Sequence, residues 1–114
     1  MICDWLRVVV VPFPFTDRPP SKRRPALVLS SRAFNAAGYT VLAMMTTRHH
    51  APWPNDTAVT DLSSAGLERP CVVRMKLFTL DNRLIEKNVG ALAASDAASF
   101  EQNLLHTLGR EQVG

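Results

Sequence analysis

The stretch from Val8 to Ser31 constrains the fold more than any other part of this sequence. It opens with Val8–Val11, four consecutive β-branched residues that are typical of a strand buried on both faces. A basic, proline-rich segment follows, and the chain becomes apolar again at Ala26–Leu29. Because Pro12 and Pro14 cannot donate backbone hydrogen bonds, the first strand must end near them or lie at a sheet edge. The pattern predicts two strands joined by a cationic loop.

Arg24 lies where this loop enters the second strand. Pro25 fixes its own φ angle and favours an extended conformation for the residue before it. Residues 18–24 contain four basic side chains and no carboxylate. A guanidinium on stiff backbone is better placed for chemistry than one on a flexible tail. We therefore predict a functional role for Arg24; the alternative is an ordinary surface arginine beside a proline.

Charge is distributed unevenly along the chain. The net charge is only +3, but residues 18–55 hold six Lys and Arg residues and no Asp or Glu. The remaining residues carry seven basic and ten acidic side chains. This asymmetry favours a local anionic partner such as a nucleic acid, although a run of charge is often simply a solvated face.

The length of 114 residues and the hydrophobic content of 46% fit one soluble globular domain over residues 1–114. No apolar run is long enough to cross a membrane and no signal peptide is recognisable, so we expect a cytoplasmic protein. Cys3 and Cys71 are far apart and form no C-x-x-C pattern, so neither a disulfide nor a zinc site is expected. Asp56 and Asp61 are isolated carboxylates, and we expect no metal or other cofactor.

Local patterns predict further strands and a C-terminal helix. We expect strands over Tyr39–Met45, Thr57–Thr60, Cys71–Leu77 and Ile85–Leu92, with Gly90 as a candidate β-bulge. Short helices or turns are expected over Ser31–Gly38, Asp61–Gly66 and Leu80–Leu84, and the N-terminus up to Trp5 is expected to be frayed or tucked in. An amphipathic helix is expected at the C-terminus, with Ser95 as its N-cap, Asp96 in its first turn and Gly109 at its end; its apolar positions are Ala97, Phe100, Leu104, Leu105 and Leu108.

Two motifs resemble one protein family. The first is Pro12-Phe-Pro-Phe-Thr-Asp17 with Ser21-Lys-Arg-Arg-Pro-Ala-Leu-Val-Leu29, and the second is Val72-Val-Arg74 with Lys76-Leu-Phe-Thr-Leu-Asp81. Together they resemble the MazF/PemK toxins of bacterial toxin–antitoxin pairs, from about Val8 to the C-terminal helix. The resemblance implies a mainly β fold with a few helices, an SH3-like small barrel of the MazF/CcdB type with a C-terminal α-helix. It also implies a homodimer and a cognate antitoxin, whose acidic and disordered tail would compete for a basic RNA groove.

The activity that this resemblance implies is that of an mRNA interferase, a metal-independent endoribonuclease that cuts single-stranded RNA. The ribose 2′-hydroxyl attacks the neighbouring phosphorus and leaves a 2′,3′-cyclic phosphate and a 5′-hydroxyl. Arg24 would hold the phosphate and stabilise the transition state, because its planar guanidinium stays protonated. A threonine at the end of the third strand lies in the family's active site, and Thr46 matches it best. Thr47 would point to the opposite face of that strand.

Further contacts with RNA are expected from Lys22, Arg23, Arg74, Lys76, Thr47 and His49. Arg74 and Lys76 would lie about 7 Å apart on one side of a strand, close to a phosphate repeat. The general base stays open, since His49 or His50 could serve by its pKa or both could be solvated loop residues. Trp53 could stack on a base or fold back over the core edge.

The sequence departs from the family's pattern at two places. Leu6-Arg7 stands where the family usually has Gly-Asp, and Lys76 stands where some members have a catalytic carboxylate, which excludes a carboxylate base there. Two rival functions therefore stay open: a gyrase-binding poison like the family's relative CcdB, and a nucleic-acid-binding module without catalysis. The basic loop and Arg24-Pro25 argue against the gyrase poison.

Overall fold

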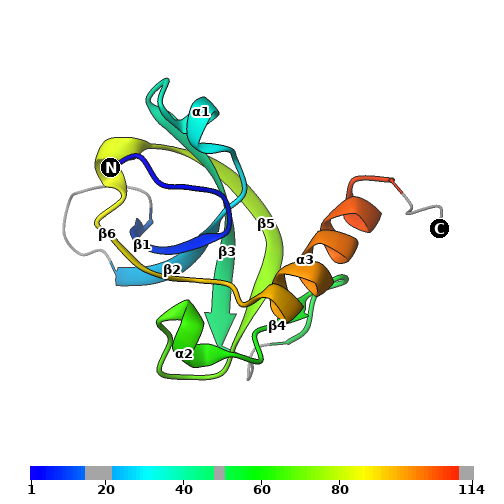
Figure 1. Cartoon of the computed structure of the whole chain (residues 1–114). Coiled ribbons are helices and arrows are strands. Elements are labelled where there is room, and N and C mark those ends of the chain that lie inside the picture. The colour runs from blue at the N-terminus through cyan, green and yellow to red at the C-terminus, as the bar shows by residue number, and fades with distance from the viewer. Residues whose placement is uncertain (15–21, 48–50, 111–114) are drawn as a thin grey trace.

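The fold is described from a computed structural model, which covers residues 1–14, 22–47 and 51–110 (Figure 1). The strands are β1 (Arg7–Phe13), β2 (Lys22–Val28), β3 (Tyr39–Thr47), β4 (Thr57–Ala58), β5 (Cys71–Asp81) and β6 (Lys87–Ala91). The helices are α1 (Arg32–Asn35), α2 (Leu62–Ala65), the 3₁₀ turn η1 (Asn82–Leu84) and α3 (Ala94–Thr107). One strongly curled sheet has the order β4-β5-β3-β2-β1-β6, with antiparallel neighbours throughout. The predicted mainly β fold with a C-terminal helix is confirmed.

The β1–β2 pair confirms the two strands expected in the opening stretch. The predicted loop boundary is wrong, because β2 already begins at Lys22, where pairing with β1 starts. Val8, Val9 and Val11 have no exposed surface. Val8 belongs to one hydrophobic cluster and Val9 and Val11 to the other, so β1 is buried on both faces. Arg24 lies opposite Val11 on the neighbouring strand, close to the point where β2 begins.

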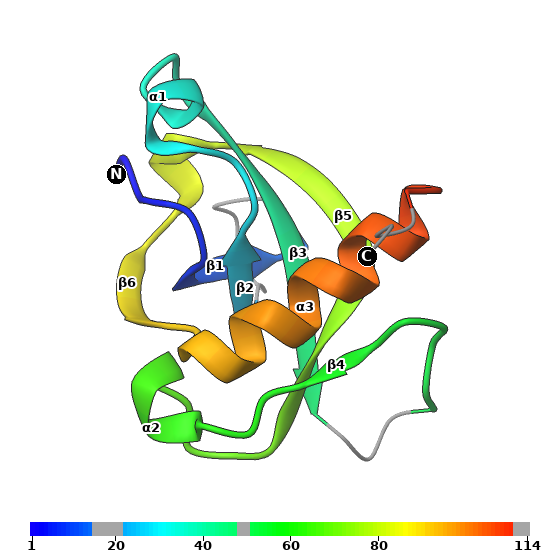
Figure 2. The ribbon, with the colours of Figure 1, turned by 45° about the vertical axis from the view of Figure 1, so that its right-hand side comes forward.

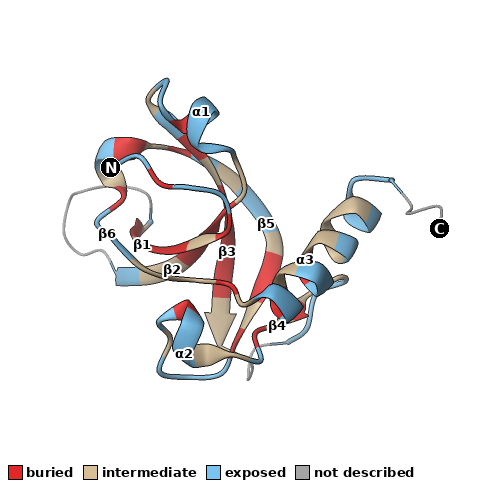
Figure 3. Cartoon of the chain, viewed as in Figure 1, coloured by how far each residue is buried: buried red, intermediate tan, exposed pale blue. Residues whose placement is uncertain are grey.

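The two hydrophobic clusters lie on opposite sides of the curled sheet. The first is covered by α3, whose Phe100 is fully buried among residues of β1, β2, β3 and β5. Figure 2 shows α3 running across the outside of the sheet, and Figure 3 shows that buried residues gather in the central strands while the helices expose their outer sides. Within the described ranges, no helix combines the length and apolar character that a membrane crossing requires.

Several element boundaries differ from the predicted ones. β3 continues to Thr47 and β5 to Asp81, because the two strands pair along most of their length and each supplies the other's backbone hydrogen bonds. β4 has only two residues, and β6 starts at Lys87 rather than at residue 85. The predicted irregularity near Gly90 is present, since the register between β1 and β6 shifts between Val8 and Val9.

The predicted N-cap of the last helix is wrong. The cap is Ala93, which makes no side-chain hydrogen bond, and Ser95 lies inside the first turn. Asp96 is 3% exposed, and its carboxylate accepts hydrogen bonds from the backbone N–H groups of Thr60 and Asp61 and from the Thr60 hydroxyl, at 2.7–3.0 Å. It therefore fastens α3 to the segment before α2, a tertiary role that a local capping pattern does not reveal.

The N-terminus is tucked in, with Cys3 buried and the Met1 ammonium donating to the Asn82 carbonyl at 3.2 Å. Leu6 has a φ of 61°, in the left-handed region that costs a residue other than glycine about 1–2 kcal/mol. Its side chain is only 6% exposed, and burying a leucine contributes about 1.5–3 kcal/mol. Burial thus offsets the backbone strain and keeps the start of β1 in place.

Two glycines allow α2 to lie directly against β6. A β-carbon on Gly66 would overlap the carbonyl of Val89, and one on Gly90 would overlap the carbonyl of Ser64. Gly66 also ends α2 with a φ of 71°, a conformation that glycine adopts at no steric cost. The backbone of α2 therefore covers β6 at its irregular point.

Candidate functional site

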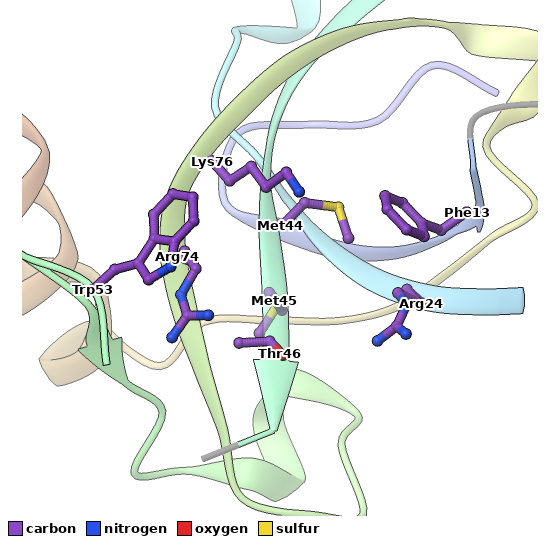
Figure 4. Close-up of a pocket in the computed structure, with 8 residues that line it drawn as sticks. All are labelled: Phe13, Arg24, Met44, Met45, Thr46, Trp53, Arg74 and Lys76. Atoms are coloured by element: carbon purple, nitrogen blue, oxygen red, sulfur yellow. The ribbon is translucent and has the colours of Figure 1, made fainter. Parts of the chain in front are cut away.

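A pocket of about 200 Å³ brings together four of the predicted site residues, Arg24, Thr46, Arg74 and Lys76. Its remaining walls are Phe13, Met44, Met45 and Trp53. Figure 4 shows Trp53 and Arg74 on one side, Phe13 and Arg24 on the other, and Thr46 between them at the end of β3. The pocket is smaller than the roughly 300–1,000 Å³ that encloses a drug-sized molecule, so it suits part of a longer ligand.

One side of the pocket carries two positive charges and, among its described lining residues, no carboxylate. The Arg24 guanidinium carbon lies 5.5 Å and the Lys76 ammonium nitrogen 5.6 Å from the centre of the Phe13 ring, within the range of cation–π attraction. None of the ion pairs in the described part of the chain involves either residue. The Arg24 Nε is buried and has no hydrogen-bond acceptor among the described residues. This side of the pocket is therefore suited to an anion.

The other side of the pocket is an internally paired cluster. The Arg74 guanidinium donates to both carboxylate oxygens of Asp56, at 3.2 and 2.9 Å, and to the Ala51 carbonyl at 2.9 Å. Burial raises the pKa of Asp56, but hydrogen bonds from Arg74 and from the Trp53 backbone N–H outweigh it and lower that pKa below its usual value. The hydrogen bond to Asp56 raises the pKa of Arg74. Both partners are ionised at neutral pH, and most of the Arg74 charge is compensated within the protein.

The pleat of the strands separates the remaining predicted residues. A second pocket, of about 470 Å³, is lined by Arg23 and Thr47, the immediate neighbours of Arg24 and Thr46. Since β3 continues through Thr47, only Thr46 faces the first pocket. Arg23 pairs with Glu86. Lys22 is exposed at the start of β2, and His49 and His50 lie outside the described residues.

Sequence reasoning missed two contributors to the site. Phe13 belongs to the quoted motif, but nothing in the motif shows that its ring lies beside two cations. Asp56 is isolated in sequence just before β4, and its partner Arg74 is 18 positions away on β5. Across residues 1–14, 22–47 and 51–110, no three His, Cys, Asp or Glu side chains gather in a group that could hold a metal ion.

A family model described as "PemK-like, MazF-like toxin of type II toxin-antitoxin system" matches residues 6–108. The chain belongs to this family. The match spans β1 to the end of α3 and so includes every wall of the first pocket.

Solved structures of PemK/MazF-like toxins share this fold. The MazE–MazF crystal structure (Form-III) from Deinococcus radiodurans is 25% identical, with a TM-score of 0.75, over 97% of this chain and 100% of that one. The Mycobacterium tuberculosis toxin MazF-mt6 is 18% identical, with a TM-score of 0.74, over 93% and 99% of the two chains. An endoribonuclease in complex with its cognate antitoxin from a mycobacterial species is 16% identical, with a TM-score of 0.74, over 98% of each chain. No curated protein matches the sequence.

Proposed function

We propose that this PemK/MazF-like toxin is a sequence-selective, metal-independent endoribonuclease that cleaves single-stranded RNA. Its family and fold support this proposal, because structural relatives include a protein described as an endoribonuclease. The observation that carries it is the Arg24 guanidinium, which lies without a carboxylate partner among the described residues in the pocket that also contains the Thr46 hydroxyl.

These two side chains suit the cleavage of RNA by its own ribose. The 2′-oxygen forms a bond to phosphorus while the bond from phosphorus to the 5′-oxygen breaks, leaving a 2′,3′-cyclic phosphate and a 5′-hydroxyl. One proton leaves the attacking hydroxyl and another reaches the departing oxygen. Arg24 supplies donors to the phosphorane's additional charge. Thr46 hydrogen-bonds the 2′-hydroxyl or a phosphate oxygen and directs the attack.

Binding of the RNA strand is assigned to the same side of the pocket. Lys76 is exposed beside Phe13 and holds a neighbouring phosphate as a point charge. RNA contacts by Lys22, Arg23, Thr47 and His49 stay predictions, as does the direct phosphate contact of Arg74. The general base stays open: His49 and His50 are candidates because both follow Thr46 closely in sequence, and the alternative is that both are solvated loop residues.

The partners belong to the same proposal. We infer a cognate antitoxin, because relatives of this fold are recorded with MazE or with a cognate antitoxin. Its acidic tail would lie over the uncompensated charges of Arg24 and Lys76. We also infer a homodimer whose RNA groove runs across or beside the subunit interface, and light scattering on the purified protein would measure its mass.

Cleavage of a long RNA in the presence of EDTA, with the new 5′ ends mapped, tests the proposal. Cleavage at defined sites is expected, and Arg24→Ala and Thr46→Val should each abolish most of it. Thr79→Val is the control, because this exposed hydroxyl on β5 lines neither of the two pockets and its removal should leave cleavage close to that of the wild type. Binding without cleavage would favour the inactive module, and gyrase inhibition with intact RNA would favour the gyrase poison.

A further inference from the structure

The segment 51–56, which directly precedes β4, is held by several hydrogen bonds. The Trp53 backbone N–H donates to the Asp56 carboxylate at 3.0 Å, and the Asp56 N–H donates to the Trp53 carbonyl at 3.3 Å. Asn55 has a φ of 63°, and its amide donates to the Thr107 hydroxyl of α3 at 2.9 Å. The Arg74 hydrogen bonds fasten the same segment to β5. The backbone that carries Trp53 is thus held in place by several hydrogen bonds.

The Trp53 indole stacks on the Arg74 guanidinium and is still partly exposed to solvent. The Arg74 guanidinium carbon lies 5.1 Å from the centre of a Trp53 ring. Trp53 is nevertheless 44% exposed and lines the first pocket. An indole held this way has little conformational freedom left to lose, so a flat ligand can stack on it at a small entropic cost.

We propose that Trp53 stacks on an unpaired RNA base and sets the base preference next to the cleaved bond, and that Arg74, paired with Asp56, is its positioning residue. This inference rests on the proposed function for its substrate. It is carried by the arrangement in Figure 4, where the aromatic wall at Trp53 faces the cationic side at Arg24 across Thr46. A nucleotide needs those two surfaces together, an anion site for its phosphate and an aromatic face for its base.

This assignment gives Arg74 a different role from the phosphate contact predicted from its strand position. Its Nε and one terminal nitrogen already donate to Asp56, and that same terminal nitrogen donates to Ala51. An arginine that already donates from Nε and one terminal nitrogen to a carboxylate inside the protein gains less from a phosphate than Arg24, which forms none of the ion pairs among the described residues. Arg74 therefore acts on RNA through the indole that it supports.

The first experiment compares two exposed tryptophans. Trp53→Ala should lower kcat/KM for RNA by about 5- to 150-fold, the loss of one base stack, and should relax the base preference at one position beside the mapped cleavage sites. Trp53→Phe should retain most of the wild-type kcat/KM and most of the base preference. Trp5→Ala is the matched control, since Trp5 is 46% exposed but does not line the pocket, and it should cleave like the wild type.

The second experiment does not depend on cleavage. In a Trp5→Phe background Trp53 is the sole tryptophan, and its fluorescence should be quenched by 2′-O-methyl RNA oligonucleotides of mixed sequence, which lack the attacking hydroxyl. Unchanged fluorescence, or a Trp53→Ala cleavage pattern identical to the wild type while Arg24→Ala is inactive, would overturn this inference and leave the nuclease assignment standing. Quenching by a protein that leaves RNA intact would support base stacking and overturn the nuclease assignment.

The positioning role has its own test. Asp56→Asn with Arg74→Met removes both charges together, so that no unpaired charge stays partly buried. In the single-tryptophan background this double variant should bind the oligonucleotides as weakly as Trp53→Ala does, with a native circular dichroism spectrum. A double variant that binds as tightly as its background would refute the positioning role.

Discussion

Replacing Arg24 by methionine should change activity and stability in opposite directions. The activity should fall by about 10²- to 10³-fold, as when a donor to a developing oxyanion is removed. The free energy of unfolding should rise, because the substitution removes a buried Nε without an acceptor among the described residues. Methionine keeps much of the apolar stem that packs beside Phe13.

The size of the stabilisation follows from two opposing terms. A buried polar group left without a hydrogen bond costs about 1–3 kcal/mol. The attraction between Arg24 and the Phe13 ring, which the variant loses, contributes about 0.5–1 kcal/mol. The variant also removes the repulsion between Arg24 and Lys76, which lie against the same ring, and this adds slightly to the free energy of unfolding. The net expectation is a gain of about 0.5–2 kcal/mol.

Urea unfolding followed by tryptophan fluorescence measures this change, and RNA cleavage by the same samples measures activity. Arg23→Met is the matched control, since Arg23 forms a largely exposed ion pair with Glu86, a kind of contact worth about 0–1 kcal/mol. The control should be no more stable than the wild type. An Arg24→Met variant that unfolds at a lower urea concentration than the wild type would show that the buried Nε is satisfied in the folded protein, and the argument for a prepared anion site would fail.

Four further predictions concern Asp96, Gly66 and Lys76. Asp96→Ala should lower the free energy of unfolding by about 3–5 kcal/mol through the loss of its hydrogen bonds. Burial raises the pKa of Asp96, but hydrogen bonds from Asp61 and Thr60 outweigh it and lower that pKa below its usual value. The stabilisation by the Asp96 carboxylate is therefore complete above about pH 4, and it is lost as the pH falls through the folded-state pKa. The free energy of unfolding of Asp96→Asn, measured in urea between pH 7 and 3, should depend less on pH than that of the wild type. Gly66→Ala should cost more than about 2 kcal/mol in thermal unfolding, since its β-carbon meets the backbone of β6 at a positive φ. Lys76→Ala should weaken RNA binding uniformly across sequences and reduce the slope of log K against log salt concentration by about 0.7; an unchanged slope would remove Lys76 from the phosphate contacts.

Much of the fold could be predicted because its signals are local. The β-branched run in β1, the glycine that ends α2 and the glycine after α3 act within a few residues of themselves, and each prediction is confirmed. The errors arise where contacts with a distant segment determine the end of an element. β5 extends past Leu77 because β3 pairs with it to Asp81, and α3 begins before Ser95 because Asp96 bonds another segment.

The candidate site shows the same division. The pleat alone predicted that Thr46 and Thr47 face opposite ways, and they line different pockets. The stiff backbone before Pro25 and the family resemblance together led to Arg24, but the unsatisfied Nε could only be found in three dimensions. The pairing of Arg74 with Asp56 could not be predicted, since the charge of a strand residue does not indicate which loop packs beside it in the fold.

The arrangement of the outermost strands bears on how the protein behaves at high concentration. Among the described strands, β4 and β6 each have a neighbour on one side only, and such edges can recruit strands from other molecules. β4 offers two residues, too few to template a new strand, while β6 carries the exposed Lys87, an irregular register and the cover of α2. These features disfavour edge-to-edge pairing with other molecules at both described edges of the sheet.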